Sequence, residues 1–119
     1  MSTPLDAEQV ARDFADRIDE RDWDGLGALL SPDFRGDYRH DGATFERDGW
    51  LAHNRDYPVR VRFVLEDLVV AGERAVLRSH VFNDDVAFCV ASFLTVTDGL
   101  ITELVEVWTD DIPTPEDNS

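Results

Sequence analysis

The sequence contains no lysine and few basic side chains: 11 arginines stand against 26 aspartates and glutamates, for a formal net charge of −15. Proteins that bind nucleic acids or anionic membranes do so largely by neutralising phosphates with lysine and arginine. Because a chain this acidic repels phosphates, neither nucleic acid nor a membrane is expected as a partner.

Cysteine and long apolar runs are also scarce. The single cysteine, Cys89, cannot form an intramolecular disulfide, and it lies in the apolar stretch VAFCVASFL, where a thiol behaves as a small hydrophobe. No apolar run approaches the roughly 18 to 20 residues that span a bilayer, and the N-terminus lacks the basic-then-apolar pattern of a signal peptide. We therefore expect a cytoplasmic protein.

Motifs for metals, nucleotides and nucleophilic catalysis are missing as well. The histidines His40, His53 and His80 have no H-x-H or H-E-x-x-H spacing, so no metal site is expected. Gly25-Leu26-Gly27 lacks the rest of a dinucleotide-binding loop, and there is no P-loop, so no cofactor is expected. No G-x-S-x-G elbow is present to activate a serine.

What is present predicts one folded domain over residues 1–110, followed by an acidic tail at 111–119 that we expect to be disordered. Hydrophobic residues make up 43% of the chain, which is enough to form a core. Helical patterns come first and most strand patterns follow, an order typical of an α+β fold.

Three helices are predicted. The first opens with Thr3 as its N-cap and Asp6 in its first turn, and it carries an apolar residue at every fourth position. Asp22 caps a second, shorter helix that ends before Ser31, and a third helix covers residues 48–57.

Strand patterns dominate the rest of the chain. A short hairpin is predicted around Asp41-Gly42, and from residue 59 onward alternating strands are joined by turns, including one at Asp98-Gly99. The long central strands are apolar on both faces, which indicates a sheet that wraps around an interior or meets a second subunit. We expect both.

Two blocks carry a family resemblance: FADRIDERDWDGLGALLSPDF, from Phe14 to Phe34, and VTDGLITELVEVW, from Val96 to Trp108. With the spacing between them, the chain resembles the nuclear transport factor 2-like superfamily over about residues 8 to 110, in particular its SnoaL-like polyketide cyclase and ketosteroid isomerase-like branch. The resemblance implies a cone-like half barrel in which three N-terminal helices pack on a curved, mainly antiparallel sheet. It also implies an apolar pocket and a homodimer formed through the outer sheet face.

The catalytic residues of the isomerases are not all matched. The position of their helix tyrosine holds Phe14, that of their aspartate base holds Tyr38 beside Asp37, and that of their protonated aspartate falls near Ser92. A steroid isomerase of that mechanism is therefore disfavoured, unless a one-residue shift turns Asp37 inward.

The cyclase branch is similar at a different position, since its acid/base carboxylate lies on the last strand and the matching residue is Glu106. Strand alternation places Thr102, Leu104, Glu106 and Trp108 on one face, and Ile101, Glu103, Val105 and Val107 on the other. In the family, the first face points into the cone. A glutamate in an apolar cavity loses hydration, so its pKa should rise towards neutrality, as a general acid or base requires.

Two alternatives stay open for Glu106. It could pair with an arginine such as Arg60, Arg62 or Arg78 and only satisfy a buried charge. The strand register could also be reversed, which would turn Glu103 inward instead.

The candidate catalytic residues are Glu106, Asp37 and His53, the last on the helix that covers the pocket in this family. The candidate pocket-lining residues are Phe14, Tyr38, Trp50, Phe63, Ser92, Leu104 and Trp108. The resemblance implies acid–base chemistry, of the isomerase or cyclase type and without a cofactor, on a hydrophobic carbonyl compound. The alternative is a non-catalytic domain of the same fold that binds a small ligand or dimerises.

Overall fold

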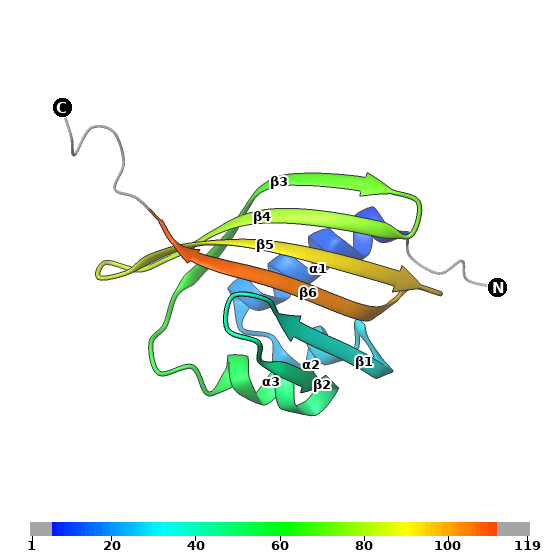
Figure 1. Cartoon of the computed structure of the whole chain (residues 1–119), viewed down its shortest axis with the longest axis horizontal. Helices are drawn as coiled ribbons and strands as arrows, with labels where there is room; N and C mark the ends of the chain where they lie inside the picture. The colour runs from blue at the N-terminus through cyan, green and yellow to red at the C-terminus, as the bar shows by residue number, and fades with distance from the viewer. Residues whose placement is uncertain (1–5, 112–119) are drawn as a thin grey trace.

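The computed structural model describes residues 6–111 (Figure 1). The predicted Thr3 cap and nearly all of the predicted acidic tail lie outside these residues. The elements are, in order, α1 (Ala7–Glu20), α2 (Trp23–Gly27), β1 (Leu30–Tyr38), β2 (Thr44–Glu46), α3 (Arg47–Arg55), β3 (Arg62–Ala71), β4 (Arg74–Phe82), β5 (Ala87–Thr97) and β6 (Leu100–Asp110).

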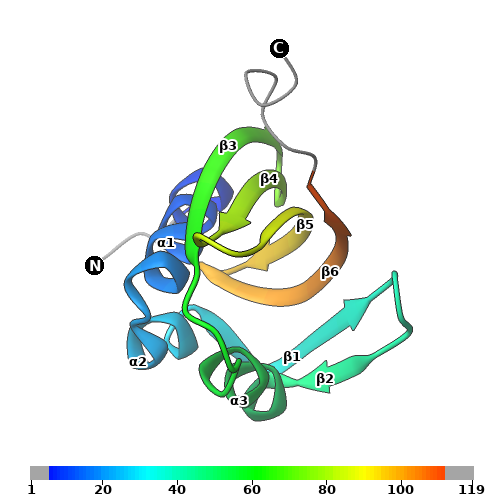
Figure 2. The same ribbon diagram turned by 90° about the vertical axis from the view of Figure 1, so that its left-hand side faces the viewer.

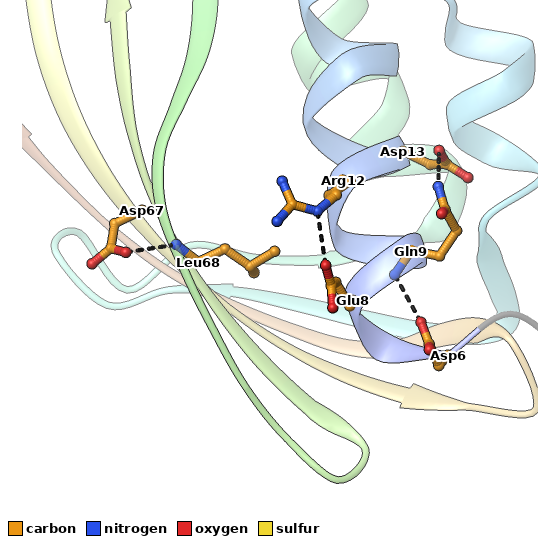
Figure 3. A network of polar contacts seen from close by, with 7 residues as sticks. All are labelled: Asp6, Glu8, Gln9, Arg12, Asp13, Asp67 and Leu68. Carbon is orange, nitrogen blue, oxygen red and sulfur yellow. Dashed lines mark hydrogen bonds and ion pairs between the residues drawn. The ribbon is translucent and has the colours of Figure 1, made fainter.

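Helix α1 starts at Ala7 because Asp6 caps it. The Asp6 carboxylate accepts a hydrogen bond from the backbone N–H of Gln9 at 2.9 Å (Figure 3). The prediction that Asp6 lies inside the first turn was wrong. The exposed face carries an ion pair between Arg12 and Glu8 at 3.1 Å, and the opposite face buries Val10.

The end of α1 has an unusual residue. Arg21 adopts a left-handed conformation with φ 58°, its N–H binds the carbonyl of Ile18, and the N–H of Asp22 binds that of Arg17. This is the Schellman pattern, in which glycine normally takes the left-handed position, because any other L-residue there costs roughly 1 kcal/mol.

Helix α2 is capped as predicted, with the Asp22 side chain accepting from the backbone N–H of Gly25 at 2.9 Å. It ends at Gly27, however, and not just before Ser31. Leu30, Ser31 and Pro32 belong to β1, where Leu30 pairs with Ile101 of β6. Tertiary strand pairing overrides the helical pattern here.

The six strands form one curved sheet in the order β2-β1-β6-β5-β4-β3, with the helices on its inner side (Figure 2). Strands β1 and β6 are parallel and the other neighbours are antiparallel, so the sheet is mixed. The prediction of three N-terminal helices was wrong, because α3 follows β2. The turn between β5 and β6 is the predicted one: Asp98 and Gly99 both have positive φ, at 53° and 79°.

A bulge changes the facing of β6 at its start. Thr95 pairs with Glu103 but Val96 pairs with Ile101, which leaves Thr102 as an extra residue. Ile101 is therefore fully buried, whereas simple alternation predicted that it lies on the outer face. From Glu103 onward, the predicted alternation holds.

The fold has its apolar core between the inner sheet face and the helices. Phe14, Leu77, Leu94 and Leu104 are completely buried there. Within residues 6–111, no helix has the length and hydropathy that a membrane span requires.

Candidate functional site

A cavity of about 340 Å³ lies between the helices and the sheet, since its lining comes from α1, α2 and α3 as well as from the strands. This volume is at the lower end of the range of ligand-binding clefts, roughly 300–1,000 Å³. Most of the lining is apolar or aromatic: Ile18, Trp23, Tyr38, Trp50, Tyr57, Val61, Phe63, Val81, Phe88 and Trp108. The polar lining residues are Arg21, His40, Asp41, His53, Asn54, Glu106, Thr109 and Asp110.

Glu106 is the buried acid of this cavity, with only 1% of the residue exposed. Its Oε2 accepts a hydrogen bond from Ser92 Oγ at 2.6 Å, and its Oε1 accepts one from Trp108 Nε1 at 3.2 Å. Burial raises the pKa of Glu106 from 4.5 to about 7, although the hydrogen bonds from Ser92, Trp108 and Tyr38 favour the ionised form. The carboxyl group can therefore both hold and release a proton near pH 7.

Strand pairing brings the partners of Glu106 together. Glu106 lies opposite Ser92 of β5 on one side and in register with Tyr38 of β1 on the other. Because paired residues project from the same face of a sheet, the three side chains form a row across three strands.

Tyr38 has a fixed hydrogen-bonding role. Trp50 Nε1 donates to the Tyr38 hydroxyl oxygen at 3.1 Å, which leaves the single hydroxyl proton of Tyr38 for Glu106. Burial, followed by the charge of Glu106, raises the pKa of Tyr38 well above its usual range. Tyr38 thus remains a neutral hydrogen-bond donor at physiological pH.

The two alternative readings of Glu106 do not describe this structure. Glu103 is exposed on the outer face. Arg62 pairs with Asp19 at 2.8 Å and Arg78 with Glu66 at 3.0 Å, while Arg60 is exposed. Within residues 6–111, Glu106 is held by hydroxyl and indole donors and has no arginine partner.

Not all candidate pocket-lining residues reach the cavity. Tyr38, Trp50, Phe63 and Trp108 line it. Phe14 is buried behind the wall and stacks on Trp50, with ring centroids 5.8 Å apart, while Leu104 is fully buried in the core. Ser92 is also fully buried and reaches the cavity only through Glu106.

Of the other two catalytic candidates, Asp37 does not lie at the site. It projects from the outer sheet face, where it is paired in register with Val105 and its carboxylate is 3.4 Å from Arg35. No register shift turns it inward, because its neighbours Gly36 and Tyr38 are both buried on the inner face of β1. His53 lines the cavity, and its ring is 5.6 Å from that of Tyr38.

Sequence reasoning missed His40 and Arg21. The His40 ring stacks on Tyr38 at 5.4 Å, and its Nδ1 accepts from the backbone N–H of Trp108 at 3.2 Å. His40 follows Tyr38 by two residues, so strand alternation extended past the end of β1 could have placed it. The sequence shows that the helical periodicity breaks at Arg21, but it does not show in which direction the Arg21 side chain leaves the helix.

The described residues also bear on metal and thiol chemistry. Within residues 6–111, no three side chains among His, Cys, Asp and Glu are grouped so that they could hold a metal ion. Cys89 is half-buried, and burial raises the pKa of its thiol. A thiol of this kind is a poor nucleophile.

Residues 11–104 match the family model described as the SnoaL-like domain. The chain belongs to the SnoaL-like family. The match spans both blocks that carry the sequence resemblance, except for the last residues of β6. Glu106 lies just beyond it.

Solved structures share the SnoaL-like fold. A candidate ketosteroid isomerase from Kribbella flavida superposes with a TM-score of 0.84 at 24% identity, covering 92% of this chain and 82% of that one. A candidate polyketide cyclase from Streptomyces antibioticus gives 0.76 at 16% identity, covering 87% and 92%. An NTF2-like protein of unknown function from Burkholderia xenovorans gives 0.82 at 14% identity, covering 92% and 87%.

At these identities the likeness shows the fold and not the activity. No protein of curated function matches the sequence. The chemistry of this SnoaL-like chain must therefore be argued from its own cavity.

Proposed function

We propose that this SnoaL-like protein binds a hydrophobic carbonyl compound in its cavity and that Glu106 transfers a proton to and from it. One observation carries the proposal: a buried carboxyl group, whose pKa is about 7, faces a largely aromatic cavity. Catalytic acids and bases work best when their pKa lies near the working pH. The likeness to candidate isomerases and cyclases supports the same chemistry.

The proposed step begins with ionised Glu106. Its carboxylate takes a proton from the carbon beside the substrate carbonyl, the C–H electron pair becomes the new C=C bond, and negative charge moves to the carbonyl oxygen. Once Glu106 is protonated, it no longer requires the proton of Tyr38, which becomes available to donate to that oxygen while Trp50 still donates to Tyr38. Return of the proton to a second carbon completes an isomerisation. If protonated Glu106 first exchanges its proton with solvent, return of the solvent-derived hydron to the first carbon completes an exchange.

The test is the exchange of the α-hydrogens of 2-tetralone, an apolar ketone, for deuterium in D₂O, followed by NMR. Glu106→Gln should lower the protein-dependent exchange rate by about 10² to 10⁴ while changing the affinity for the ketone only a few fold. Glu103→Gln is the matched control, since it makes the same change on the exposed face of the same strand. Equal losses of binding and rate in Glu106→Gln would contradict the role of a base.

The second candidate function is ligand binding without turnover. One observation favours it: the Glu106 carboxylate already accepts from Ser92, Trp108 and Tyr38, which leaves it little free capacity for a substrate proton. Under this reading 2-tetralone binds, but wild type and Glu106→Gln give the same exchange rate as buffer.

We also propose that two copies associate through the outer sheet face. An apolar row crosses four neighbouring strands there, formed by Val69, Val76, Phe93 and Val105, which are paired in register. Val69 is 61% exposed, and apolar residues of this kind are typical of an interface.

Analytical ultracentrifugation tests this association. Wild type should sediment at twice the 13.5 kDa of one chain, and Val105→Asp should sediment as a single chain, because it places a charge in the row. Val59→Asp, a matched change in the exposed segment before β3, should remain dimeric. A wild type that already sediments as one chain would contradict the proposal.

A further inference from the structure

Arg21 is a cation at the cavity that forms no ion pair with the carboxylates of residues 6–111. Of the 11 arginines, seven form ion pairs within residues 6–111, and Arg21, Arg39, Arg60 and Arg74 do not. Among these four, only Arg21 lines the cavity. In a chain with 26 acidic residues, an arginine left unpaired at a ligand cavity calls for an explanation.

The nearest acids in the sequence are already engaged elsewhere. Arg17 holds both Glu20 and Asp22, each at 3.5 Å, and Asp22 also caps α2. The two carboxylates that flank Arg21 in the sequence are thus already bound, both to Arg17 and that of Asp22 also to the first turn of α2. Its own positive charge is left for the cavity.

The guanidinium of Arg21 is also positioned. It lies over the ring of Trp23, 5.4 Å from the centroid, and both residues line the cavity. A guanidinium held over an aromatic face keeps its N–H donors at its edge, where they suit the two oxygens of a carboxylate. The left-handed backbone at Arg21, which would favour glycine, fixes the direction in which this side chain leaves α1.

We propose that the cavity is selective for carbonyl compounds that carry one carboxylate, which Arg21 binds. This inference rests on the proposed function, because it names the substrate class of the same cavity. One charge is the limit, since Asp41 and Asp110 also line the cavity and would repel a second. The net charge of −15 does not prevent binding, because charges more than about 8 Å away are largely screened at physiological ionic strength.

The test compares two probes by isothermal titration calorimetry: 4-oxo-4-phenylbutanoate, which has one aromatic ketone and one carboxylate, and its uncharged methyl ester. Wild type should bind the acid more tightly than the ester. Arg21→Gln should weaken binding of the acid by about ten- to a hundredfold, the usual effect of losing a charge-assisted pair, and leave the ester within about twofold.

Two further variants control for folding and net charge. Arg21→Gly places glycine where the backbone favours it, so it should fold at least as well as wild type and lose the acid to the same degree. Arg74→Gln removes an unpaired arginine that does not line the cavity, and it should bind both probes as wild type does.

The outcomes separate this inference from the proposed proton transfer. Acid binding that depends on Arg21, without deuterium exchange, supports the inference and contradicts catalysis. Exchange that depends on Glu106, with the acid and ester bound equally or with both weakened equally in Arg21→Gln, contradicts the inference alone. Failure of wild type to bind either probe contradicts the inference as well.

Discussion

Glu103 and Glu106 are the same residue type, three positions apart on one strand, yet they lie in opposite environments. Glu103 is exposed on the outer face of β6, while Glu106 is almost completely buried and accepts hydrogen bonds from three other residues. The difference arises only from the two-residue repeat of a strand. It teaches that the chemistry of this site comes from position on the sheet and not from composition, since the many acids within residues 6–111 include one that is buried.

The largest expected effect is a dependence of folding stability on pH that arises from Glu106. Because the pKa of Glu106 is raised from 4.5 to about 7 in the folded state, folded protein holds this proton more tightly than unfolded protein. The resulting stabilisation is fully present below pH 4.5 and is lost as pH rises through 7. It amounts to on the order of 3 kcal/mol.

Urea unfolding at a series of pH values measures this effect. The free energy of unfolding of wild type, relative to Glu106→Gln, should fall by about 3 kcal/mol between pH 4.5 and 8. Relative to Glu103→Gln, it should stay nearly constant, because the Glu103 side chain is exposed on the outer face and folding does not remove it from water. If the difference in the free energy of unfolding between wild type and Glu106→Gln does not change with pH, the Glu106 carboxyl group of the wild type is hydrated.

A smaller effect on stability is expected from substitutions at two buried serines, one of which donates a hydrogen bond to Glu106. Ser92 donates to Glu106, whereas Ser79 Oγ is buried without a hydrogen-bond partner among the described residues. Ser92→Ala should raise the pKa of Glu106 further and cost about 1–2 kcal/mol at pH 8, where the carboxylate needs its donors. Ser79→Ala should be neutral or slightly stabilising, because no bond is lost.

Carboxyl-carbon NMR of Glu106 and urea unfolding provide the two measurements for this pair. If Ser92→Ala and Ser79→Ala change the free energy of unfolding equally, the hydrogen bond from Ser92 to Glu106 does not contribute measurably to stability.

Much of this arrangement could be predicted from the sequence. The alternation in β6 placed Glu106 inward, and the Asp98-Gly99 turn fixed where β6 begins. Both signals are local, since one follows from side-chain period and the other from positive φ. The order of helical and strand patterns predicted the α+β class, and the family resemblance supplied the expectation of a curved, cone-like sheet.

What failed depended on long-range pairing. Leu30 joins a strand because it pairs with Ile101, and Ile101 turns inward because of the bulge at Thr102. Asp37 points outward because Tyr38, its neighbour, takes the inner position beside Glu106. A sequence shows none of these pairings directly. The cavity residue His40 was missed for a different reason, because alternation was not extended past the end of β1, and Arg21 because the direction of its side chain depends on the left-handed end of α1.

The place of β6 in the sheet has a consequence for folding. It is the last strand in the sequence but lies between β1 and β5, and the Tyr38–Glu106 pair joins residues from opposite parts of the chain. Contacts so distant in sequence form slowly, because a long loop must close before they are gained. Until β1 pairs with β6, the sheet would consist of two parts with open edges, β2-β1 and β6-β5-β4-β3, and such edges can pair with other chains. The strand that carries the acid therefore also makes the pairing that joins the two parts of the sheet.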